Sequence, residues 1–433
     1  MAFVSKFATE DSGLFSLSVN GFVPRTAIVP LVQDSDAHPQ VLIRAGDRVR
    51  EGQMIAQGKN GAVHATIPGT VTDVSVVQYP DGKQGLAAKI KLGGAFSYTG
   101  KKRTAVDWHS YDAHMLHHLL AEKGVVNTFK KCVPLSEQIQ NLHPKSARVL
   151  VVRLFDDDPS RVTETFVAAQ NAREVTAGAA VVAKAMRAAG IVFVRGADKK
   201  DAVVAQKADD VAFAAPAYVV GCDTSSYPAG TMHDLVGAVK KQLKDKPFAD
   251  VGNRDVFVDV QTAIAAYRAV VQGTPLMENY VHVTGDCLNA GAIMKVKIGT
   301  TLGDLAMQCG GFKRTVAKIV INGIATGFSV SSLDVPVTKM VKSVAFLPPR
   351  KAKKQYDEPC IRCGACRKIC PVALYPDMFY RSFLHGADAT ELEKNYAATS
   401  LLCTNCTLCN AVCPSRLPLS QVAALLKGAS DEK

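Results

Sequence analysis

The sequence predicts a multidomain α/β protein with an additional all-helical domain near its C-terminal end. Three observations support this fold class. Short alternating strands near the N-terminus are followed by a long region in which strand-like and helical segments alternate, and two copies of one cysteine pattern come last. A chain of 433 residues is long enough for about three domains, and a hydrophobic content of 48% is ordinary for α/β proteins.

We expect residues 1–104 to form a small β domain. Segments 41–56 and 65–74 contain short alternating strands separated by Gly-Asp and Pro-Gly turns, which is typical of a β-sandwich. The pattern resembles the barrel-sandwich hybrid of lipoyl and biotinyl domains. Those carriers present a modifiable lysine on a hairpin, whereas residues 60–64 contain none. The sequence therefore favours a structural role over a swinging carrier arm.

Residues 105–278 are expected to form an α/β domain. Residues 148–155 are strand-like, residues 161–189 form an Ala-rich stretch that predicts one long helix, and residues 191–194 return as a strand. This succession is a βαβ unit. It implies a mostly parallel sheet that is covered by helices.

Residues 279–346 are expected to form a compact β-grasp unit. Residues 281–286 predict a strand that enters a turn, residues 297–305 predict a capped short helix, and residues 318–323 predict a second strand that ends at a turn. Nothing in this unit supplies a nucleophile or a general base. We therefore expect it to pack or to bind.

The two cysteine runs are the most specific feature of the chain. Each has the spacing Cys-x2-Cys-x2-Cys-x3-Cys-Pro, which is the ligand run of a [4Fe–4S] cluster. In two-cluster ferredoxins the fourth cysteine of each run binds the other cluster, so we assign two crossed ligand sets. The first set is Cys360, Cys363, Cys366 and Cys413. The second set is Cys403, Cys406, Cys409 and Cys370.

Zinc and disulfides are the alternative interpretations of these cysteines. Structural zinc closes its tetrahedron with two separated ligand pairs and has no use for a third cysteine at the same spacing. Disulfides need an oxidising compartment, and residues 1–6 show no signal peptide, which points to a reducing cytoplasm. The remaining cysteines are scattered, and we expect them to be small buried hydrophobic residues: Cys132, Cys222, Cys287 and Cys309.

Residues 356–433 are therefore expected to form an all-helical ferredoxin domain with two clusters. The stretch 372–402 between the runs is too long and too polar for a tight loop, and it predicts helices. Within it, Phe379, Phe383 and Leu384 are expected to share one helical face.

The formal net charge of +12 is unevenly distributed. Basic and acidic residues are equal in number over residues 356–433, so the excess lies upstream, with a concentration in a basic linker at residues 347–355. The linker is either a solvated connector or a docking surface for an acidic partner, such as a ferredoxin, an anionic headgroup or a partner subunit. Nucleic acid is not expected, because no aromatic residues interleave with these lysines to stack bases.

The chain as a whole resembles the C subunit of the Rnf electron-transport complex, a membrane-bound ion-translocating ferredoxin:NAD oxidoreductase. Both cysteine runs, residues 327–339, the turn at residues 283–286 and residues 227–230 carry the resemblance. It implies a barrel-sandwich hybrid, a flavoprotein-like α/β domain, an SLBB-like β-grasp unit and a helical ferredoxin. It also implies a peripheral subunit on the cytoplasmic face of the membrane, docked on integral and peripheral partner subunits. No apolar stretch reaches the roughly 18 residues of a membrane span.

Three departures from the family pattern concern its nucleotide site. Members that bind NADH and FMN carry a Gly-Gly-Ala-Gly-Phe-Pro loop, whereas residues 122–130 here retain one glycine, Gly124. The family's Asn-Gly-Ala-Glu-Cys-Glu-Pro stretch is replaced by residues 153–159, which contain three consecutive aspartates, and its Gly-Gly-Pro-Met-x-Gly turn by residues 322–327. We expect the clusters to persist and the FMN and NADH site to be weakened or lost.

The function predicted from the sequence is electron transfer. A soluble carrier would pass single electrons to the paired clusters, and membrane subunits of the translocase would couple the flow to ion movement, so this polypeptide would be a non-catalytic subunit. Two alternatives stay open. One is a working NADH dehydrogenase subunit with an atypical FMN and NADH site, and the other is a docking scaffold whose clusters are structural.

Overall fold

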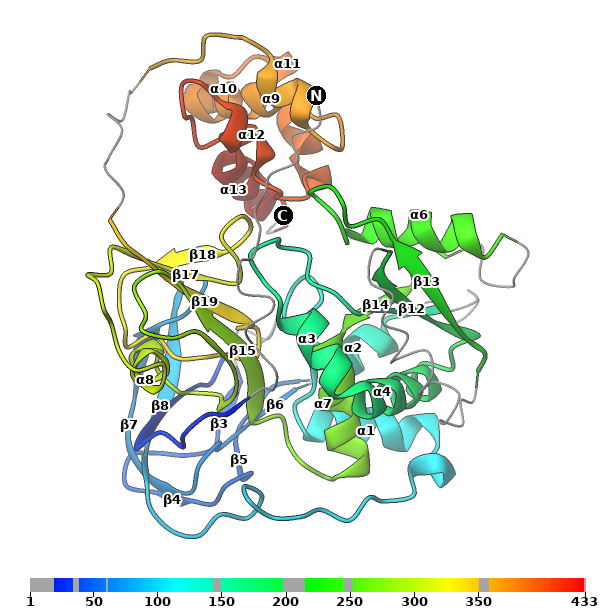
Figure 1. Cartoon of the computed structure of the whole chain (residues 1–433), viewed down its shortest axis with the longest axis vertical. Helices are drawn as coiled ribbons and strands as arrows, with labels where there is room; N and C mark the ends of the chain where they lie inside the picture. The colour runs from blue at the N-terminus through cyan, green and yellow to red at the C-terminus, as the bar shows by residue number, and fades with distance from the viewer. Residues whose placement is uncertain are drawn as a thin grey trace. The chain divides into compact units, whose positions relative to one another are not determined.

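The structure is a computed structural model of the whole chain. It describes residues 19–33, 39–59, 61–142, 149–197, 215–244, 251–252, 254–349 and 358–431. The chain divides into two compact units, residues 1–348 and residues 349–433 (Figure 1). Most of the predicted basic linker, from residue 350 onward, lies outside the described residues.

The first part of unit 1 is a β-sandwich, as predicted. One antiparallel sheet has the order β2 (Thr26–Pro30), β8 (Gln84–Leu92), β7 (Gly69–Gln78), β4 (Arg48–Val49), and the other has the order β3 (Gln40–Val41), β5 (Met54–Gln57), β6 (Ala62–His64). The two sheets share one hydrophobic core, in which Val29, Ile55 and Ile90 are completely buried. Burial of these alternating apolar side chains between the sheets holds the sandwich together.

The second part of unit 1 contains a four-stranded sheet in which every pairing is parallel. Its order is β13 (Ala217–Cys222), β12 (Gly190–Gly196), β11 (Val149–Arg153), β14 (Val256–Asp259). One face packs against α1 (Ala113–Glu122), α4 (Ala172–Ala185) and α7 (Val260–Val271), and the other packs against α6 (Met232–Gln242) (Figure 1). Side chains from successive positions of β11 enter opposite cores, because side chains alternate along a strand. The predicted parallel sheet covered by helices is therefore present.

The predicted single helix at residues 161–189 was wrong, because the structure has two helices there. α3 (Thr163–Gln170) ends and α4 begins at Asn171. The Asn171 side chain donates to the carbonyl of Val167 at 3.1 Å, and its own backbone leaves the helical region with φ −114°. Asparagine competes with the helix for backbone hydrogen bonds, which explains the break within an otherwise Ala-rich stretch.

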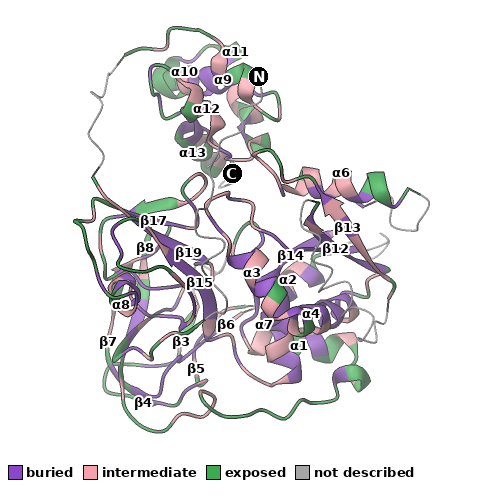
Figure 2. Cartoon of the chain, viewed as in Figure 1, coloured by how far each residue is buried: buried purple, intermediate pink, exposed green. Residues whose placement is uncertain are grey.

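A six-stranded sheet forms the third part of unit 1. Its order is β1 (Val19–Asn20), β16 (Ala292–Lys297), β15 (Glu278–Thr284), β19 (Ser343–Leu347), β17 (Lys318–Ile321), β18 (Phe328–Val330). The strands β15 and β19 are buried (Figure 2), and α8 (Leu302–Gln308) covers their core from an N-cap in which Thr301 accepts from the N–H of Asp304 at 3.1 Å. The predicted strands and helix of this region are present. β1 comes from the predicted N-terminal domain but pairs here, with β16.

The described residues of unit 2 form helices and no β-strand. The helices are α9 (Ala365–Ile369), α10 (Pro376–His385), α11 (Glu391–Ala398), α12 (Leu408–Val412) and α13 (Leu419–Asp431). Phe379 is completely buried, but Phe383 and Leu384 are exposed, so the expected common apolar face was wrong. The buried face of α10 instead continues from Phe379 to Ser382. In the described part of the chain, no helix combines the length and apolar character needed to cross a lipid bilayer.

Candidate iron–sulfur site

Unit 2 contains two copies of one structural element, offset by the 43 residues that separate Cys360 from Cys403. In each copy a short helix begins after the second cysteine of the run, and a longer helix begins after the Cys-Pro step. The short helices are α9 and α12, and the longer helices are α10 and α13. The start of each helix in the second copy follows its counterpart by the same offset. The copies pack against each other through α9 with α12 and through α10 with α13.

The backbone is left-handed at matching positions of the two copies. Between the first two cysteines, Arg362 has φ 55° and Asn405 has φ 56°. After the second cysteine, Gly364 has φ 72° and Thr407 has φ 62°. Alternation of left-handed and right-handed residues turns successive N–H groups to one side of the chain, which forms a concave site for negatively charged groups. Such sites are common around iron–sulfur clusters.

Two cavities lie inside unit 2, and each is lined by four cysteines. The cysteines of the first are Cys360, Cys363, Cys366 and Cys413. The cysteines of the second are Cys403, Cys406, Cys409 and Cys370. The structure thus brings together the two crossed sets that we assigned from the sequence. Each cavity takes three thiols from one copy and the fourth from the other.

The remaining walls of the cavities are largely apolar. Leu417 and Leu419 line the first cavity, and Leu374 and Phe379 line the second. Backbone N–H groups also face the sulfurs, since that of Leu374 lies 3.3 Å from Cys370 Sγ and that of Asn405 lies 3.4 Å from Cys403 Sγ. Apolar walls exclude water, and N–H donors stabilise thiolate sulfur.

Burial raises the pKa of Cys366 to about 11 and that of Cys409 to about 12. These two thiols therefore resist ionisation as long as no metal binds them. A metal-bound thiol is deprotonated outright, because the positive charge of the metal outweighs burial. Within the residues that the structure describes, no three His, Cys, Asp or Glu side chains gather as ligands of a single metal ion. Four soft sulfur donors in each cavity, with inward N–H groups, fit an iron–sulfur cluster.

The other four cysteines belong to unit 1. Cys222, Cys287 and Cys309 are buried, as expected, whereas Cys132 is only partly buried. Its Sγ lies 2.6 Å from the carbonyl oxygen of Gln33.

A second polar site, at the carboxyl ends of β11 and β14, was not predicted. Ligands of open α/β sheets bind where the strand order reverses, and β11 and β14 flank that point here. Asp259, the last residue of β14, is completely buried, and the Nζ of Lys342 lies 2.5 Å from its Oδ2. The same Nζ lies 2.8 Å from Oε1 of buried Glu164. The hydroxyl of Thr128 also donates to Asp259, at 2.7 Å.

The charges of this cluster shift the pKa values of its members. Burial alone would raise the pKa of Asp259, but Lys342 outweighs it and lowers the pKa to about 2. Burial raises the pKa of Glu164 to about 7 against the opposing effect of Lys342. One buried lysine thus pairs with two buried carboxyl groups, one of which titrates near neutral pH.

The three consecutive aspartates of the replaced family stretch bind groups of the chain itself. Asp157 Oδ2 lies 3.0 Å from Arg153, and Asp157 also pairs with Arg161. Although burial alone would raise the pKa of Asp157, these two guanidinium groups hold it below its ordinary range. Asp158 accepts from the N–H groups of Ala325 and Thr326, at 3.1 and 2.8 Å. The aspartates therefore connect β11 to the turn at residues 322–327.

Gly124, the one glycine left in the altered nucleotide loop, is required for packing. It has φ 67°, and a Cβ at this position would lie 2.2 Å from the carbonyl oxygen of Ala62 in β6. Lys339 joins the same two segments of chain, because its Nζ lies 2.8 Å from the carbonyl of Ala62 and 2.9 Å from that of Gly124. Gly124 and Lys339 thus hold the β-sandwich against the α/β part of unit 1.

Comparison with known protein families and proteins agrees with these features. The model of the RnfC barrel sandwich hybrid domain matches residues 8–93, and that of the 4Fe-4S dicluster domain matches residues 357–417. The chain is 27% identical over 362 residues to the C subunit of the "proton-translocating ferredoxin:NAD(+) oxidoreductase complex" of Clostridium ljungdahlii, covering 82% of this chain and 78% of that protein.

Relatives from two further bacteria are named as C subunits of an "ion-translocating oxidoreductase complex". The protein of Yersinia enterocolitica is 25% identical and that of Erwinia tasmaniensis 26% identical, each over 83% of this chain. The chain spans about half of their lengths, 52% and 45% respectively. Among solved structures, NAD+-reducing [NiFe]-hydrogenase in the air-oxidized state aligns with 74% of this chain and 61% of that chain, at 13% identity and a TM-score of 0.47. Over about four-fifths of its length the chain is similar to proteins that are named as C subunits of ion-translocating oxidoreductase complexes.

Proposed function

We propose that this chain relays electrons through two [4Fe–4S] clusters, as a subunit of an ion-translocating ferredoxin:NAD oxidoreductase complex. The observation that carries the proposal is the crossed arrangement of eight cysteines around two cavities of one small unit. The matching dicluster domain model and the names of the relatives support it.

The chain's own part in this function is to hold the two clusters, to shield them and to keep them close to each other. When bound, the clusters supply one-electron redox chemistry. Cys370 extends from the first copy into the second cavity, and Cys413 extends from the second copy into the first. This exchange keeps the two cavities next to each other, and their largely apolar walls surround the buried sulfurs of Cys366 and Cys406. No side chain of the relay needs to form or break a covalent bond with a substrate, so the role proposed for this subunit is non-catalytic.

We further propose that FMN and NADH are not bound tightly. A phosphate or a flavin at the strand-order reversal would have to replace Lys342, Asp259 and Glu164, which are buried and already paired with each other. Carboxylates at this position also repel phosphate. The only glycine left in the loop, Gly124, is used for packing against Ala62.

The proposed partners are the other subunits of the complex and an acidic soluble carrier such as ferredoxin. The chain would lie at the cytoplasmic face of the membrane as a peripheral subunit, held there by integral partners. The finer description of unit 1 as a barrel-sandwich hybrid at 1–104, a flavoprotein-like domain at 105–278 and an SLBB-like β-grasp domain at 279–346 is part of the same proposal.

Anaerobic purification with iron, zinc and flavin analysis tests the proposal. We expect about eight irons per chain, two interacting EPR signals after reduction, and substoichiometric zinc. Cys370→Ser should abolish the cluster of the Cys403 set and leave that of its own run, and Cys413→Ser should do the reverse. Colourless, zinc-loaded protein would refute the relay.

The two alternative functions give different results in the same preparation. Tightly bound FMN, or bleaching of the cluster absorbance by NADH without another subunit, would indicate an NADH dehydrogenase subunit. Intact clusters that exchange no electrons with reduced ferredoxin would indicate a scaffold with structural clusters.

A further inference from the structure

The two copies in unit 2 differ in charge at several matching positions. Among them are four charged residues of the first copy whose counterparts in the second are uncharged: Arg362, Arg367, Lys368 and Asp377. Arg362 also lines the first cavity, but of these four side chains only that of Asp377 is buried, so water screens the others. The offset of 43 residues between Cys360 and Cys403 relates Asp377 at the start of α10 to Ser420 at the start of α13. Asp377 lines the cavity of the Cys360 set, and Ser420 lines the cavity of the Cys403 set. One cavity therefore has a carboxyl group where the other has a hydroxyl group.

The carboxyl group of Asp377 lies beside one sulfur of its cavity, that of Cys366. Its side chain is buried, and Oδ1 lies 3.9 Å from Cys366 Sγ. Its other partner is Arg367, whose Nε lies 2.7 Å from Oδ1. The Arg367 side chain is 41% exposed, lies over the ring of Tyr375, and is not part of the cavity lining. The negative end of this ion pair thus lies toward the cavity, while water screens the positive end.

The matching groups in the second copy carry no charge. Asn410 replaces Arg367, and its Oδ1 accepts from the backbone N–H of Ser420 at 2.8 Å. The Ser420 hydroxyl lies 3.1 Å from Oε1 of Gln421. Thr407, which replaces Gly364, and Thr404 add further hydroxyl groups to the lining of this cavity. The ion pair of the first copy has therefore become a neutral hydrogen bond in the second.

We propose that Asp377 makes the two clusters unequal, so that the cluster of the Cys360 set has the lower reduction potential and an electron in the relay resides mainly on the cluster of the Cys403 set. This inference rests on the proposed relay function. Reduction adds negative charge, which a fixed carboxylate opposes by Coulomb repulsion. Net charge and hydrogen bonds to sulfur are among the properties that set cluster potentials. Asp377 acts through the field at the cluster, as a tuning residue.

Redox titration of the full chain, followed by EPR, tests the inference. Asp377→Asn keeps the shape and an acceptor for Arg367 but removes the charge. It should raise the lower of the two midpoint potentials by about 59 mV, which corresponds to a roughly tenfold change in the equilibrium constant of one-electron reduction. The higher midpoint potential should move much less. Ser420→Asp adds a carboxylate to the other cavity and should lower the higher midpoint.

Two further variants serve as controls. Asp377→Glu keeps the charge and should keep both midpoints, and Asp388→Asn removes an exposed carboxylate that does not line either cavity and should change neither. The inference is overturned if Asp377→Asn moves the midpoints no more than Asp388→Asn does, or if it raises the higher midpoint instead. If Asp377→Asn lost iron, Ser420→Asp would still decide, since it removes no contact of Asp377. Wild-type protein without two clusters would instead refute the relay itself.

Discussion

At the scale of single residues, Lys342 is a buried cation of unit 1. Its ammonium group is buried and bridges Asp259 and Glu164, which come from β14 and α3. Each carboxylate also caps backbone N–H groups, because Asp259 accepts from Thr262 and Glu164 accepts from Val260, at 2.8 and 2.9 Å. Lys342 therefore holds together the first turn of α7, the C-terminal end of β14 and the first turn of α3.

We predict that Lys342→Met lowers the free energy of unfolding by about 3–5 kcal/mol at pH 8, because it leaves two buried carboxylates without a cation. In the variant the pKa values of Asp259 and Glu164 both rise above those of the unfolded chain. Folding is then penalised more as pH increases, so the difference from wild type should shrink at pH 5. Urea unfolding of the variant and the wild type at pH 5 and pH 8 measures this difference in the free energy of unfolding.

The sign of this dependence follows from the wild-type groups. Asp259, with a pKa of about 2, adds stability above the unfolded value of 3.8 that is lost only as pH falls through 2. Glu164, with a pKa of about 7, costs stability as pH rises from 4.5 through 7. Lys89→Met removes a lysine from an exposed pair with Asp73 and should cost less than about 1 kcal/mol at either pH. An equal loss at pH 5 and pH 8 for Lys342→Met would contradict the prediction.

At the scale of secondary-structure elements, the contact between α4 and α7 depends on one glycine. Gly178 lies in α4, and a Cβ there would come within 1.8 Å of the carbonyl oxygen of Ala263 in α7. Gly237 lies in α6, and a Cβ there would meet no atom within 4 Å. Both glycines are in helices, so a comparison of the two positions distinguishes the effect of close helix packing from the effect of helix propensity.

We predict opposite effects of alanine at these two glycines. Gly178→Ala should destabilise unit 1 by about 1–3 kcal/mol, because α4 and α7 must move apart. Gly237→Ala should stabilise it by up to about 1 kcal/mol, because alanine has the higher helix propensity and the space is open. Thermal and urea unfolding of the two variants measure the difference. A stabilising Gly178→Ala would show that the helices are not as close as described.

Several elements could be predicted from local patterns and others could not. The parallel strands β11 and β12 were predicted, because their continuous apolar residues are typical of strands buried on both faces. The strands β16 and β19 were missed, since their place is set by pairing with β15, which is distant in sequence from β19. The break at Asn171 was missed because the Ala-rich composition on both sides favours helix.

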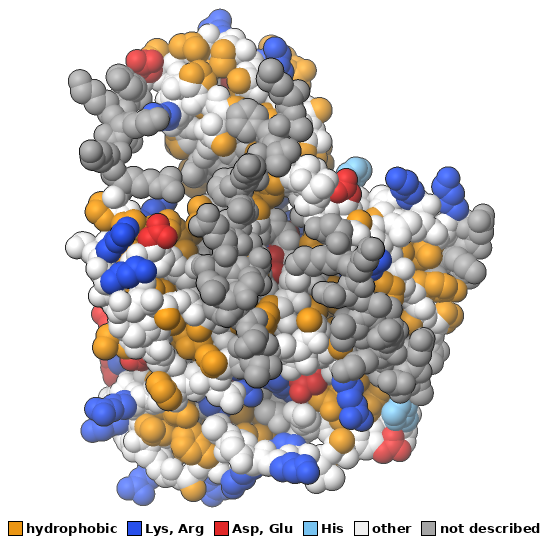
Figure 3. Space-filling model, in the orientation of Figure 1, with side chains coloured by type: hydrophobic (Ala, Val, Ile, Leu, Met, Phe, Trp, Pro, Cys, Tyr) orange, Lys and Arg blue, Asp and Glu red, His pale blue; other side chains and the backbone are white. Residues whose placement is uncertain are grey.

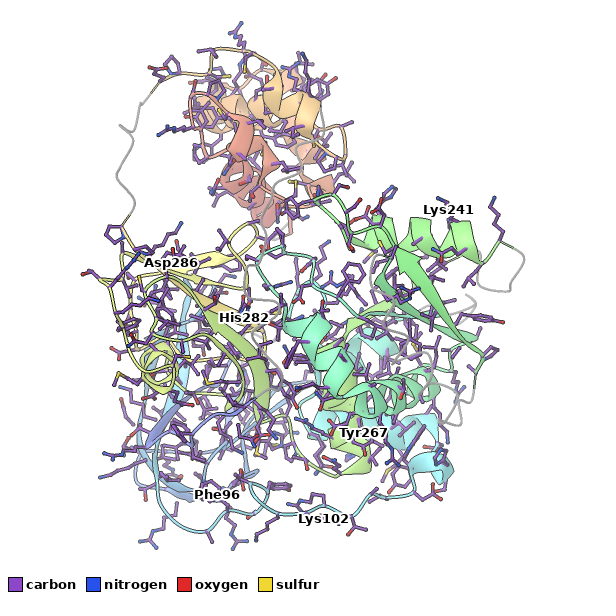
Figure 4. The ribbon with its side chains drawn as sticks, in the orientation of Figure 1. Phe96, Lys102, Lys241, Tyr267, His282 and Asp286 are labelled. Atoms are coloured by element: carbon purple, nitrogen blue, oxygen red, sulfur yellow. The ribbon has the colours of Figure 1, made fainter. Side chains whose placement is uncertain are left out.

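At the scale of the whole molecule, the net positive charge lies upstream of the cluster domain. On the face shown in Figure 3, Lys and Arg side chains are spread over unit 1 rather than gathered in one patch. Lys102, for example, lies on the connecting segment after the sandwich (Figure 4) and is exposed. A spread of positive charge attracts an acidic carrier over a distance without fixing where it docks.

We predict that reduction by an acidic ferredoxin slows as salt increases from about 0.05 to about 0.5 M, because salt screens this attraction. Triple replacement of Lys351, Lys353 and Lys354 by Glu should slow reduction at low salt by about tenfold or more if the linker is the docking surface. Stopped-flow reduction at several ionic strengths measures both effects. Lys101→Glu with Lys102→Glu changes charge elsewhere and should slow it less. If the linker replacements and the replacements at Lys101 and Lys102 slowed reduction equally, the attraction would come from net charge alone and not from docking at the linker.

The crossed assignment of the eight cysteines stays a prediction. The sequence by itself determined their spacing, which limits the kind of cluster that a short run can bind, and this limit is local. The same holds for the loss of glycines from the nucleotide loop. Only the tertiary structure decided which groups fill the strand-order reversal, since Asp259 and Lys342 are 83 residues apart and meet through packing. It also decided that Asp377, which no motif marks, lies beside Cys366. A charge acts on groups that are close to it in space, and only the fold brings residues that are far apart in sequence close together.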